Sequence, residues 1–235
     1  MKPFLYIDTW HTEQPSTRFE AALQRSGLPV QVHRVQRGEF PEPGQPACGV
    51  FVGPSKSGAY DDEPWIHTLH DVLEGLARTG VPMLGLCFGS QVLASALLGR
   101  DQVFKRGDRE TGYAEIQFTD AGREDPLTRD FPTTVRTFHW HGDEVRADHP
   151  DALILARNAA CGNQLWRWRR GPVWGIQPHP EMDRQQICEF MEKNRQWFIE
   201  EGKDVDALIR GAEANDQLSP IFDRFLEIVA GRTKA

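Results

Sequence analysis

The sequence is poor in cysteine, lacks a long uninterrupted apolar run and has no excess of basic residues. Its four cysteines, Cys48, Cys87, Cys161 and Cys188, show no CxxC spacing, so they suggest neither a disulfide framework nor a zinc site. The 235 residues include 27 Lys and Arg against 34 Asp and Glu, which gives a formal net charge of −7. Nucleic acids and anionic membrane surfaces bind basic proteins, so we expect neither as a partner.

The short apolar segments argue against a targeting or membrane sequence. The apolar run near the N-terminus ends at Asp8, too early for the hydrophobic part of a signal peptide. Residues 79–99 carry no charge and are long enough to cross a bilayer, but Pro82, Gly85 and Gly89 divide them into a strand, a turn and a helix. We therefore expect no membrane span and a cytoplasmic location with reduced thiols.

Apolar periodicity predicts an α/β fold. In the first half, predicted strands over 3–7, 30–35, 49–53 and 82–86 alternate with predicted helices over 17–26 and 64–79 and from about 89. That alternation is typical of a parallel sheet covered by helices on both faces. Further predicted strands over 113–118, 134–140, 152–156, 164–168 and 173–177 indicate an antiparallel extension. Apolar stripes around 187–198 and 218–229 predict two core-facing helices.

One cysteine lies at a predicted strand-to-helix turn. Cys87 stands midway between Gly85 and Gly89, where the strand over 82–86 must turn into a helix. Glycines two residues before and after a central residue let strand and helix backbones approach closely, as in a nucleophile elbow. The helix dipole there favours a thiolate, and the N–H of Phe88 would face an oxyanion. Because cysteine is often just a small buried hydrophobe, this pattern alone leaves a structural role open.

A histidine late in the sequence supplies the base that a thiol nucleophile needs. His179 follows the predicted strand over 173–177 and lies between Pro178 and Pro180, which hold its backbone extended. Glu181 can accept a hydrogen bond from the imidazole and fix its tautomer. A lone histidine is more often structural than catalytic, but this segment in a chain with a cysteine elbow favours catalysis.

These motifs resemble a known enzyme family. GLCFGSQ at 85–91 together with QPHPE at 177–181 is similar to the class I (triad) glutamine amidotransferases. VGPS at 52–55 resembles the family's oxyanion loop, although Val52 stands where the first glycine is usual. The segments 60–65 and 138–143 resemble the stand-alone subgroup of GMP-synthase-like proteins.

The resemblance implies a flavodoxin-like three-layer αβα sandwich, with a mostly parallel sheet and an antiparallel extension. It implies a single domain over 1–235 with a helical C-terminal tail from about 183. Carried over by position, Cys87 is the nucleophile, His179 the general base and acid, and Glu181 the residue that orients the histidine. The N–H groups of Gly53 and Phe88 form the oxyanion hole.

The resemblance also assigns residues to substrate binding. Gln91 matches a glutamine that helps bind the amino-acid end of the substrate. His139, Trp140 and His141 match a loop that holds the same group through backbone atoms. Pro178 replaces a common phenylalanine, which changes the pocket wall rather than the chemistry.

The implied reaction is acyl transfer without a cofactor. The Cys87 thiolate attacks the γ-amide of glutamine or a related γ-glutamyl compound, forms a glutamyl thioester and releases ammonia or an amine, and water then releases glutamate. The pairs His67/His70 and His139/His141 could suggest metal ligands. No third ligand is evident from the sequence, so we expect no metal site.

Three hypotheses remain for the biological role. They are a free-standing γ-glutamyl hydrolase, a glutaminase subunit that passes ammonia to a separate synthase chain, and a catalytically idle regulatory protein. The complete set of Cys87, His179 and Glu181 argues against the third. No nucleotide-activating motif occurs, so we do not expect this chain alone to make GMP. A protease or chaperone with a cysteine elbow is disfavoured, because Phe88 stands where its histidine is typical. Substrate, pathway and oligomeric state are not predicted.

Overall fold

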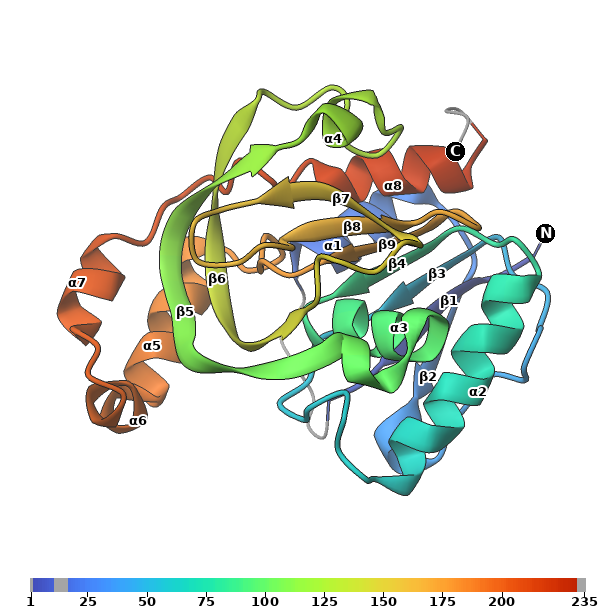
Figure 1. Ribbon diagram of the computed structural model, residues 1–235, viewed down its shortest axis with the longest axis horizontal. Coiled ribbons are helices and arrows are strands. Elements are labelled where there is room, and N and C mark those ends of the chain that lie inside the picture. Colours follow the sequence, from blue (N-terminus) through green and yellow to red (C-terminus); the bar gives the residue numbers. More distant parts are fainter. Residues whose placement is uncertain (1, 11–16, 232–235) are drawn as a thin grey trace.

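The computed structural model describes residues 2–10 and 17–231, while residues 1, 11–16 and 232–235 lie outside this description. The strands are β1 (Phe4–Asp8), β2 (Val30–Arg34), β3 (Gly49–Val52), β4 (Met83–Leu86), β5 (Val103–Phe118), β6 (Thr134–Val145), β7 (Ala152–Arg157), β8 (Leu165–Trp168) and β9 (Val173–Ile176). Within the described ranges they form one 9-stranded sheet in the order β2-β1-β3-β4-β9-β8-β7-β5-β6 (Figure 1).

The sheet is mixed. β2, β1, β3, β4 and β9 are neighbours in parallel pairings, and β9, β8, β7, β5 and β6 continue in antiparallel pairings. The change of direction occurs at β9, which pairs with β4 in parallel on one side and with β8 antiparallel on the other. The predicted α/β class with an antiparallel extension is confirmed, but the sheet is mixed rather than mostly parallel.

Helices cover both faces of the parallel half. The helices of the chain are α1 (Arg18–Ser26), α2 (Pro64–Arg78), α3 (Phe88–Leu98), α4 (Asp120–Glu124), α5 (Arg184–Lys193), α6 (Arg195–Glu200), α7 (Val205–Arg210) and α8 (Ile221–Val229), of which α1, α2, α3 and α8 lie at the parallel half. On one face, Phe19 of α1 and Phe222 of α8 have ring centroids 5.5 Å apart and pack with Leu84 of β4. On the other face, Leu73 of α2 packs with Met83 of the same strand. The order of layers is therefore αβα.

The first two helices begin at residues that favour a helix start. Thr17 and Glu20 form a capping box at the start of α1. Pro64 occupies the first position of α2, where its missing N–H would have no partner within the helix. Both starts agree with the predicted ranges 17–26 and 64–79.

The strands β5 and β6 are much longer than the sequence predicts. They pair as an antiparallel ribbon whose ends are Val103 opposite Val145 and Gln117 opposite Thr134. Figure 1 shows this ribbon curving away from the rest of the sheet, and only the last two residues of β5 pair with β7. The first ten residues of β5 are rich in charge and lack apolar alternation. Periodicity therefore detected only the part of β5 that faces the main core.

A smaller core lies against the ribbon. Ile187 and Met191 of α5 and Phe198 of α6 pack there with Phe138 of β6. The predicted continuous helix over 187–198 divides at Asn194, whose side-chain amide donates to a carbonyl of α5 at 2.7 Å. The short helices α6 and α7 therefore turn back over the same apolar cluster, and α8 returns to the main sheet.

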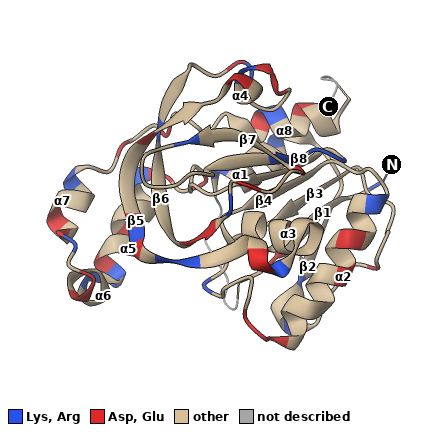
Figure 2. Cartoon of the chain, viewed as in Figure 1, with Lys and Arg blue, Asp and Glu red and all other residues tan. Residues whose placement is uncertain are grey.

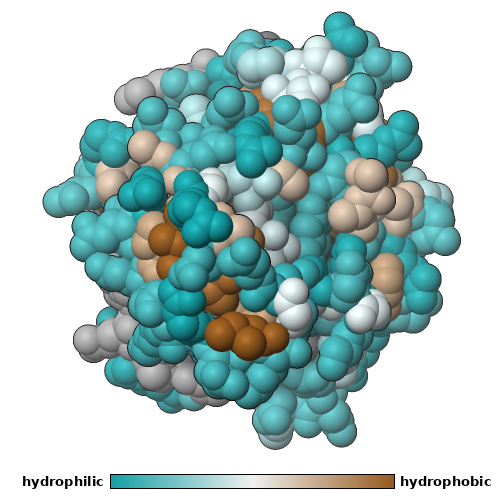
Figure 3. Space-filling view, turned by 90° about the vertical axis from the view of Figure 1, so that its left-hand side faces the viewer, coloured by the Kyte–Doolittle hydropathy of each residue, from teal (hydrophilic) through white to brown (hydrophobic). Residues whose placement is uncertain are grey.

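The surface carries charge of both signs. Acidic and basic residues are interspersed along the helices and the ribbon in Figure 2. Figure 3 shows hydrophobic patches on an otherwise mostly hydrophilic face at the α5–α7 end of the molecule. In the parts of the chain that the structure describes, no helix has the length and apolar character needed to cross a membrane.

Candidate active site

A cysteine forms the turn between β4 and α3. Cys87 has φ 51° and ψ −107°, and within the described ranges no other residue except glycine has a positive φ. Its N–H donates to the carbonyl of Ile176 at 2.7 Å, and its own carbonyl accepts the N–H of Gln91 at 3.0 Å. A positive φ is costly for a residue with a Cβ, and such backbone concentrates at functional sites. The turn has the geometry of a nucleophile elbow.

Two glycines allow this turn. A Cβ built on Gly85 would lie 2.4 Å from the carbonyl carbon of Gly89. A Cβ built on Gly89 would lie 2.1 Å from the carbonyl oxygen of Val52. The strands β4 and β3 and the first turn of α3 thus meet through backbone atoms. These contacts explain why glycine stands two residues on either side of Cys87.

The neighbouring strand brings a histidine to the same edge of the sheet. β9 pairs with β4 in parallel, with Ile176 in register with the residue before Cys87, so the two chains leave the sheet side by side. His179 is 2% exposed, and its N–H donates to the carbonyl of Phe138 at 2.7 Å. Its Nδ1 lies 2.7 Å from Oε1 of Glu181, which is also buried. The carboxylate therefore fixes the ring orientation of the histidine.

The surroundings of His179 favour its protonated form. Burial lowers the pKa of His179, but the negative charges of Glu181 and of the Cys87 thiolate outweigh burial and raise it well above its usual value. Nε2 of His179 and Oε2 of Glu181 have no hydrogen-bond partner among the described residues. The histidine thus holds a proton close to the cysteine and leaves one ring nitrogen unpaired.

Two glutamine side chains complete the surroundings of the cysteine. Nε2 of Gln177 donates to Sγ of Cys87 at 3.6 Å, and Oε1 of Gln177 accepts Nε2 of Gln91 at 3.1 Å. The same nitrogen of Gln91 also donates to the carbonyl of Asp143 at 3.4 Å. Gln91, assigned to substrate binding by resemblance, lines the cavity, but its amide nitrogen is already paired within the protein.

Cys87 opens into a cavity of about 480 Å³. The loop after β3, the ribbon, Asn194 and Trp197 of α6 contribute to its walls. Among the described residues, five charged side chains line it, namely Lys56, Asp61, Lys105, Arg109 and Asp143. Its volume lies in the range of small-molecule sites, and it presents both signs of charge to a ligand.

Ring contacts and hydrogen bonds fix the polar groups on the cavity wall. The guanidinium of Arg109 lies 4.8 Å from the ring centroid of Trp197 and pairs with Glu201 at 3.4 Å. The hydroxyl of Tyr60 donates to Oδ1 of Asp143 at 3.0 Å. Burial and that carboxylate together raise the pKa of Tyr60 to about 12.

One of the two expected oxyanion donors is already used. The N–H of Gly53 donates to the carbonyl of Ile7 at 3.0 Å, because the parallel pairing of β3 with β1 continues to this residue. The N–H of Gly53 is therefore paired within the sheet in this conformation, and its role in the oxyanion hole stays a prediction. The N–H of Phe88 differs, because Phe88 is the first residue of α3 and no carbonyl within the helix can accept from it.

The segment 139–141 divides between two surroundings. Trp140 and His141 both line the cavity, and the ring centroid of Trp140 lies 6.0 Å from that of His179 and 4.5 Å from that of Phe190. Because side chains alternate along a strand, His139 and His141 share the opposite face of β6. The side chains of both histidines are fully buried beside Glu110 of β5, which supplies the third candidate metal ligand that the sequence did not reveal.

The other cysteines lie elsewhere. None of the three lines the cavity around Cys87 within the described part of the chain, and all four cysteines are free thiols. Burial raises the pKa of the Cys48 and Cys161 thiols, which disfavours a reactive thiolate at either position.

Several groups of the site are not visible in the sequence. Gln177 belongs to the QPHPE motif, but only the structure gives its contact with the sulfur of Cys87. Arg109, Asp143 and Trp197 come from distant segments that the ribbon and α6 bring around one cavity. No local spacing reveals such a set, although Asp143 lies in a motif already noted for its resemblance.

Comparison with known proteins identifies related sequences. A family described as glutamine amidotransferase class-I matches residues 16–196. The chain is 30% identical over 124 residues to a glutamine-hydrolyzing GMP synthase subunit of Pyrococcus abyssi, a match that covers 52% of this chain and 63% of that protein. It is 34% identical over 105 residues to a glutamine-hydrolyzing GMP synthase subunit of Methanospirillum hungatei. This match covers 45% of this chain and 53% of that protein. The chain thus spans less than two thirds of the length of these curated relatives.

Solved structures share the fold. A glutamine amidotransferase from Thermotoga maritima has a TM-score of 0.82 at 22% identity and covers 97% of both chains. A glutamine amidotransferase from Methylobacillus flagellatus has a TM-score of 0.77 at 24% identity and covers 99% of this chain and 94% of its own. At these identities the similarity establishes the architecture.

Proposed function

Because the chain belongs to the class-I glutamine amidotransferase family, we propose that it hydrolyses the side-chain amide of glutamine, or of a related γ-glutamyl compound, through a thioester on Cys87. One observation carries the proposal, namely the elbow cysteine at the strand edge beside the buried pair of His179 and Glu181. A nucleophile, a base and a carboxylate that orients the base form the arrangement expected for acyl transfer.

In the first half-reaction, the thiolate of Cys87 attacks the amide carbon of the substrate and a C–S bond forms. The C–N bond then breaks, and the imidazolium of His179 gives its proton to the leaving nitrogen, which departs as ammonia or an amine. The raised pKa of His179 supports this role, because it favours the protonated ring that the leaving nitrogen requires. The N–H of Phe88 stabilises the oxyanion; losing such a donor typically costs about 10²- to 10³-fold in rate.

In the second half-reaction, water attacks the thioester. The now neutral His179 accepts one proton from that water, and the C–S bond breaks, which restores the thiolate of Cys87 and the imidazolium of His179. The product loses the other proton of the water to solvent and leaves as glutamate. Glu181 keeps the ring oriented in both steps through its contact with Nδ1. No metal or cofactor takes part in this sequence of steps.

The cavity supports an amino-acid substrate. A zwitterionic head group carries one ammonium and one carboxylate, and the cavity wall offers Asp61 and Asp143 for the first and Lys105 and Arg109 for the second. Trp140 would lie beside the carbon chain that leads to Cys87. The backbone of the 139–141 segment remains a proposed contributor to head-group binding, and Gln91 contributes through its amide oxygen.

A glutaminase subunit is the second candidate. The relatives from Pyrococcus abyssi and Methanospirillum hungatei are named as subunits of GMP synthase, which supports a partner chain that receives the ammonia. Exposed hydrophobic surface at the α5–α7 end, where Ile199 is 51% exposed, offers a place for such a partner.

We also propose that residues 1–235 act as one domain with its helical tail from about 183. We further propose that the protein works in the cytoplasm, where four free thiols persist.

A substrate panel tests the proposal. The purified chain is incubated with glutamine, γ-glutamyl peptides and γ-glutamyl amines, and released glutamate is measured for the wild type, Cys87→Ala and the control Cys188→Ala. Turnover by the chain alone that is lost only in Cys87→Ala supports the hydrolase. Turnover that needs an added synthase chain supports the glutaminase-subunit role. Equal turnover by Cys87→Ala contradicts both.

A further inference from the structure

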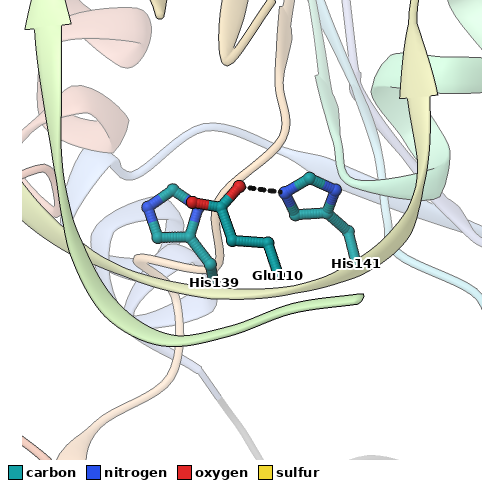
Figure 4. A group of neighbouring side chains, drawn as sticks. All are labelled: Glu110, His139 and His141. Carbon is teal, nitrogen blue, oxygen red and sulfur yellow. Dashed lines mark hydrogen bonds and ion pairs between the residues drawn. The ribbon is translucent and has the colours of Figure 1, made fainter. Parts of the chain in front are cut away.

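A buried polar cluster spans the two strands of the ribbon. Glu110 of β5 is in register with His141 of β6, and His139 lies two residues before His141 on the same face (Figure 4). One ligand atom from each of the three lies within 4.8 Å of the other two. The side chains are 9%, 0% and 0% exposed in the order Glu110, His139 and His141. Within the described residues this is the one group with metal-ligand chemistry.

Both ring nitrogens of His141 face hydrogen-bond acceptors, which a neutral imidazole cannot satisfy. Its Nδ1 lies 3.0 Å from the carbonyl oxygen of Asp143, which can only accept, so Nδ1 carries a proton. Its Nε2 lies 3.0 Å from Oε2 of Glu110, which as a carboxylate can also only accept. A neutral imidazole cannot satisfy both contacts. A second ring proton, a proton on the carboxyl group of Glu110 or a metal cation between Nε2 and the carboxylate each satisfies both contacts.

His139 favours the metal cation. Its side chain is fully buried, and neither ring nitrogen has a hydrogen-bond partner among the described residues. Nδ1 lies 3.7 Å from Oε1 of Glu110, which is too far for a hydrogen bond but suits two ligands of one ion. An unpaired polar side chain in the interior is costly, and a bound ion removes that cost, whereas a second proton on His141 does not.

The surroundings of Glu110 match those of a ligand carboxylate. Nδ2 of Asn158 donates to its Oε1 at 2.6 Å and Nε2 of Gln164 donates to its Oε2 at 2.8 Å, which fixes its orientation. Its ion-pair partners in the described ranges are the two histidines, with no lysine or arginine. Metal-bound carboxylates are typically hydrogen-bonded in this way, and metal-bound histidines donate their second nitrogen to a carbonyl, as His141 does.

We propose that Glu110, His139 and His141 bind a divalent transition-metal ion of the Zn²⁺ type, with Nε2 of His141 and Nδ1 of His139 as its nitrogen ligands. Two imidazoles and one carboxylate suit zinc, and buried water completes the tetrahedral set. The site is structural. β6 also supplies the Phe138 carbonyl that accepts from His179 and the Asp143 carbonyl that accepts from Gln91, so the ion holds the strand behind the catalytic pair.

Metal binding is tested on the full chain without an activity assay. The Cys87→Ser protein, which removes the reactive thiol as a competing ligand, is stripped with a chelator and titrated with Zn²⁺ and with Co²⁺. We expect one bound ion per chain by elemental analysis, a rise in Tm with Zn²⁺ concentration, and a Co²⁺ absorption spectrum of nitrogen and oxygen ligation without a thiolate band. A stripped chain that binds no Zn²⁺ and shows no change in Tm overturns the proposal.

Variants separate a metal site from a hydrogen-bond network. Glu110→Gln and His139→Leu should weaken Zn²⁺ binding by at least about 100-fold, and Gln164→Leu, which removes a donor to the ligand, by about 10- to 100-fold. The control His67→Asn, on the exposed face of α2, should bind as the parent does. The stability of His139→Leu also separates the two cases. If no ion binds, the substitution only removes an unpaired polar group from the interior and should not lower the Tm. If an ion binds, the substitution removes a ligand and should lower the Tm measured with Zn²⁺. If His139→Leu and Glu110→Gln retain the parent affinity, the proposal is wrong.

Discussion

At residue 87 one side chain combines three conditions for a nucleophile. Cys87 lies at the start of α3, its backbone has φ 51°, and Nε2 of Gln177 donates to its sulfur at 3.6 Å. The first two follow from a seven-residue motif, because a helix start and a glycine-framed turn are local features. The Gln177 contact depends on how β9 pairs with β4, and for that reason the sequence does not reveal it. His179 and Glu181 were predictable together, because two residues of separation suffice for their contact.

The two members of the histidine pair should contribute unequally to catalysis. His179→Ala removes the proton carrier, so kcat for γ-glutamyl hydrolysis should fall by about 10²- to 10⁴-fold. Glu181→Gln should reduce kcat less, because the glutamine can still contact Nδ1. Steady-state rates for both variants, with Glu189→Gln on the exposed side of α5 as control, measure the order. A larger loss in Glu181→Gln than in His179→Ala contradicts these roles.

The same pair predicts a pH dependence of stability. The folded-state pKa of His179 lies well above its unfolded value of about 6.5, so the folded state binds the proton more tightly. The resulting stabilisation is fully present below about pH 6.5 and is lost as the pH rises through the folded-state pKa. Glu181→Gln removes the largest contribution that raises this pKa.

The difference in Tm between wild type and Glu181→Gln should therefore be largest near pH 6 and shrink toward alkaline pH. Thermal unfolding over a pH series measures it, and Glu189→Gln should show a small and constant difference. A Tm difference for Glu181→Gln that grows with rising pH contradicts the assigned charge state.

At the scale of elements, strand ends position the site. The parallel strands β3, β4 and β9 are neighbours in the sheet, and the segments that follow them carry Ser55, Cys87 and His179. Sequence periodicity predicted these strands, because each is buried on both faces and reads as a short apolar run. It missed most of the ribbon, the break at Asn194 and the helix α7, because charged ribbon strands and one-turn helices leave no apolar period.

The close contact of β3 with α3 predicts an intolerant position. Gly89→Ala places a methyl group 2.1 Å from the carbonyl oxygen of Val52, so the elbow must shift. We expect a loss of about 1–3 kcal/mol in the free energy of unfolding together with loss of activity. Gly107→Ala is the matched control, because nothing lies within 4 Å of its added Cβ. Urea unfolding compares the two variants, and equal stability would remove the packing argument.

At the scale of the molecule, the last helix, α8, packs against the sheet at β1 and β9. Phe225 of α8 is fully buried, and its ring centroid lies 6.3 Å from those of Phe4 in β1 and Trp174 in β9. The apolar stripe around 218–229 predicted a core-facing helix, and the structure confirms it. The residues that α8 packs against were not predictable, because an apolar stripe shows which face of a helix is buried but not which elements cover it.

Removing that ring should therefore destabilise the whole fold. Phe225→Ala leaves a cavity between α8 and the sheet and should lower the free energy of unfolding by about 3–5 kcal/mol. Ile199→Ala, at a side chain that is 51% exposed on α6, should change it little. Urea denaturation curves give both values, and similar effects of the two variants would mean that α8 is not part of the cooperative core.

Covalent labelling tests the central claim, that Cys87 is the nucleophile, most directly. The intact chain is treated with a diazo-ketone analogue of glutamine, digested and mapped by mass spectrometry, with free glutamine as competitor. We expect one modified residue, Cys87, protection by glutamine and no labelling of Cys87→Ala, even if turnover requires a partner chain. Labelling spread over Cys48, Cys161 and Cys188, or retained in Cys87→Ala, would contradict it.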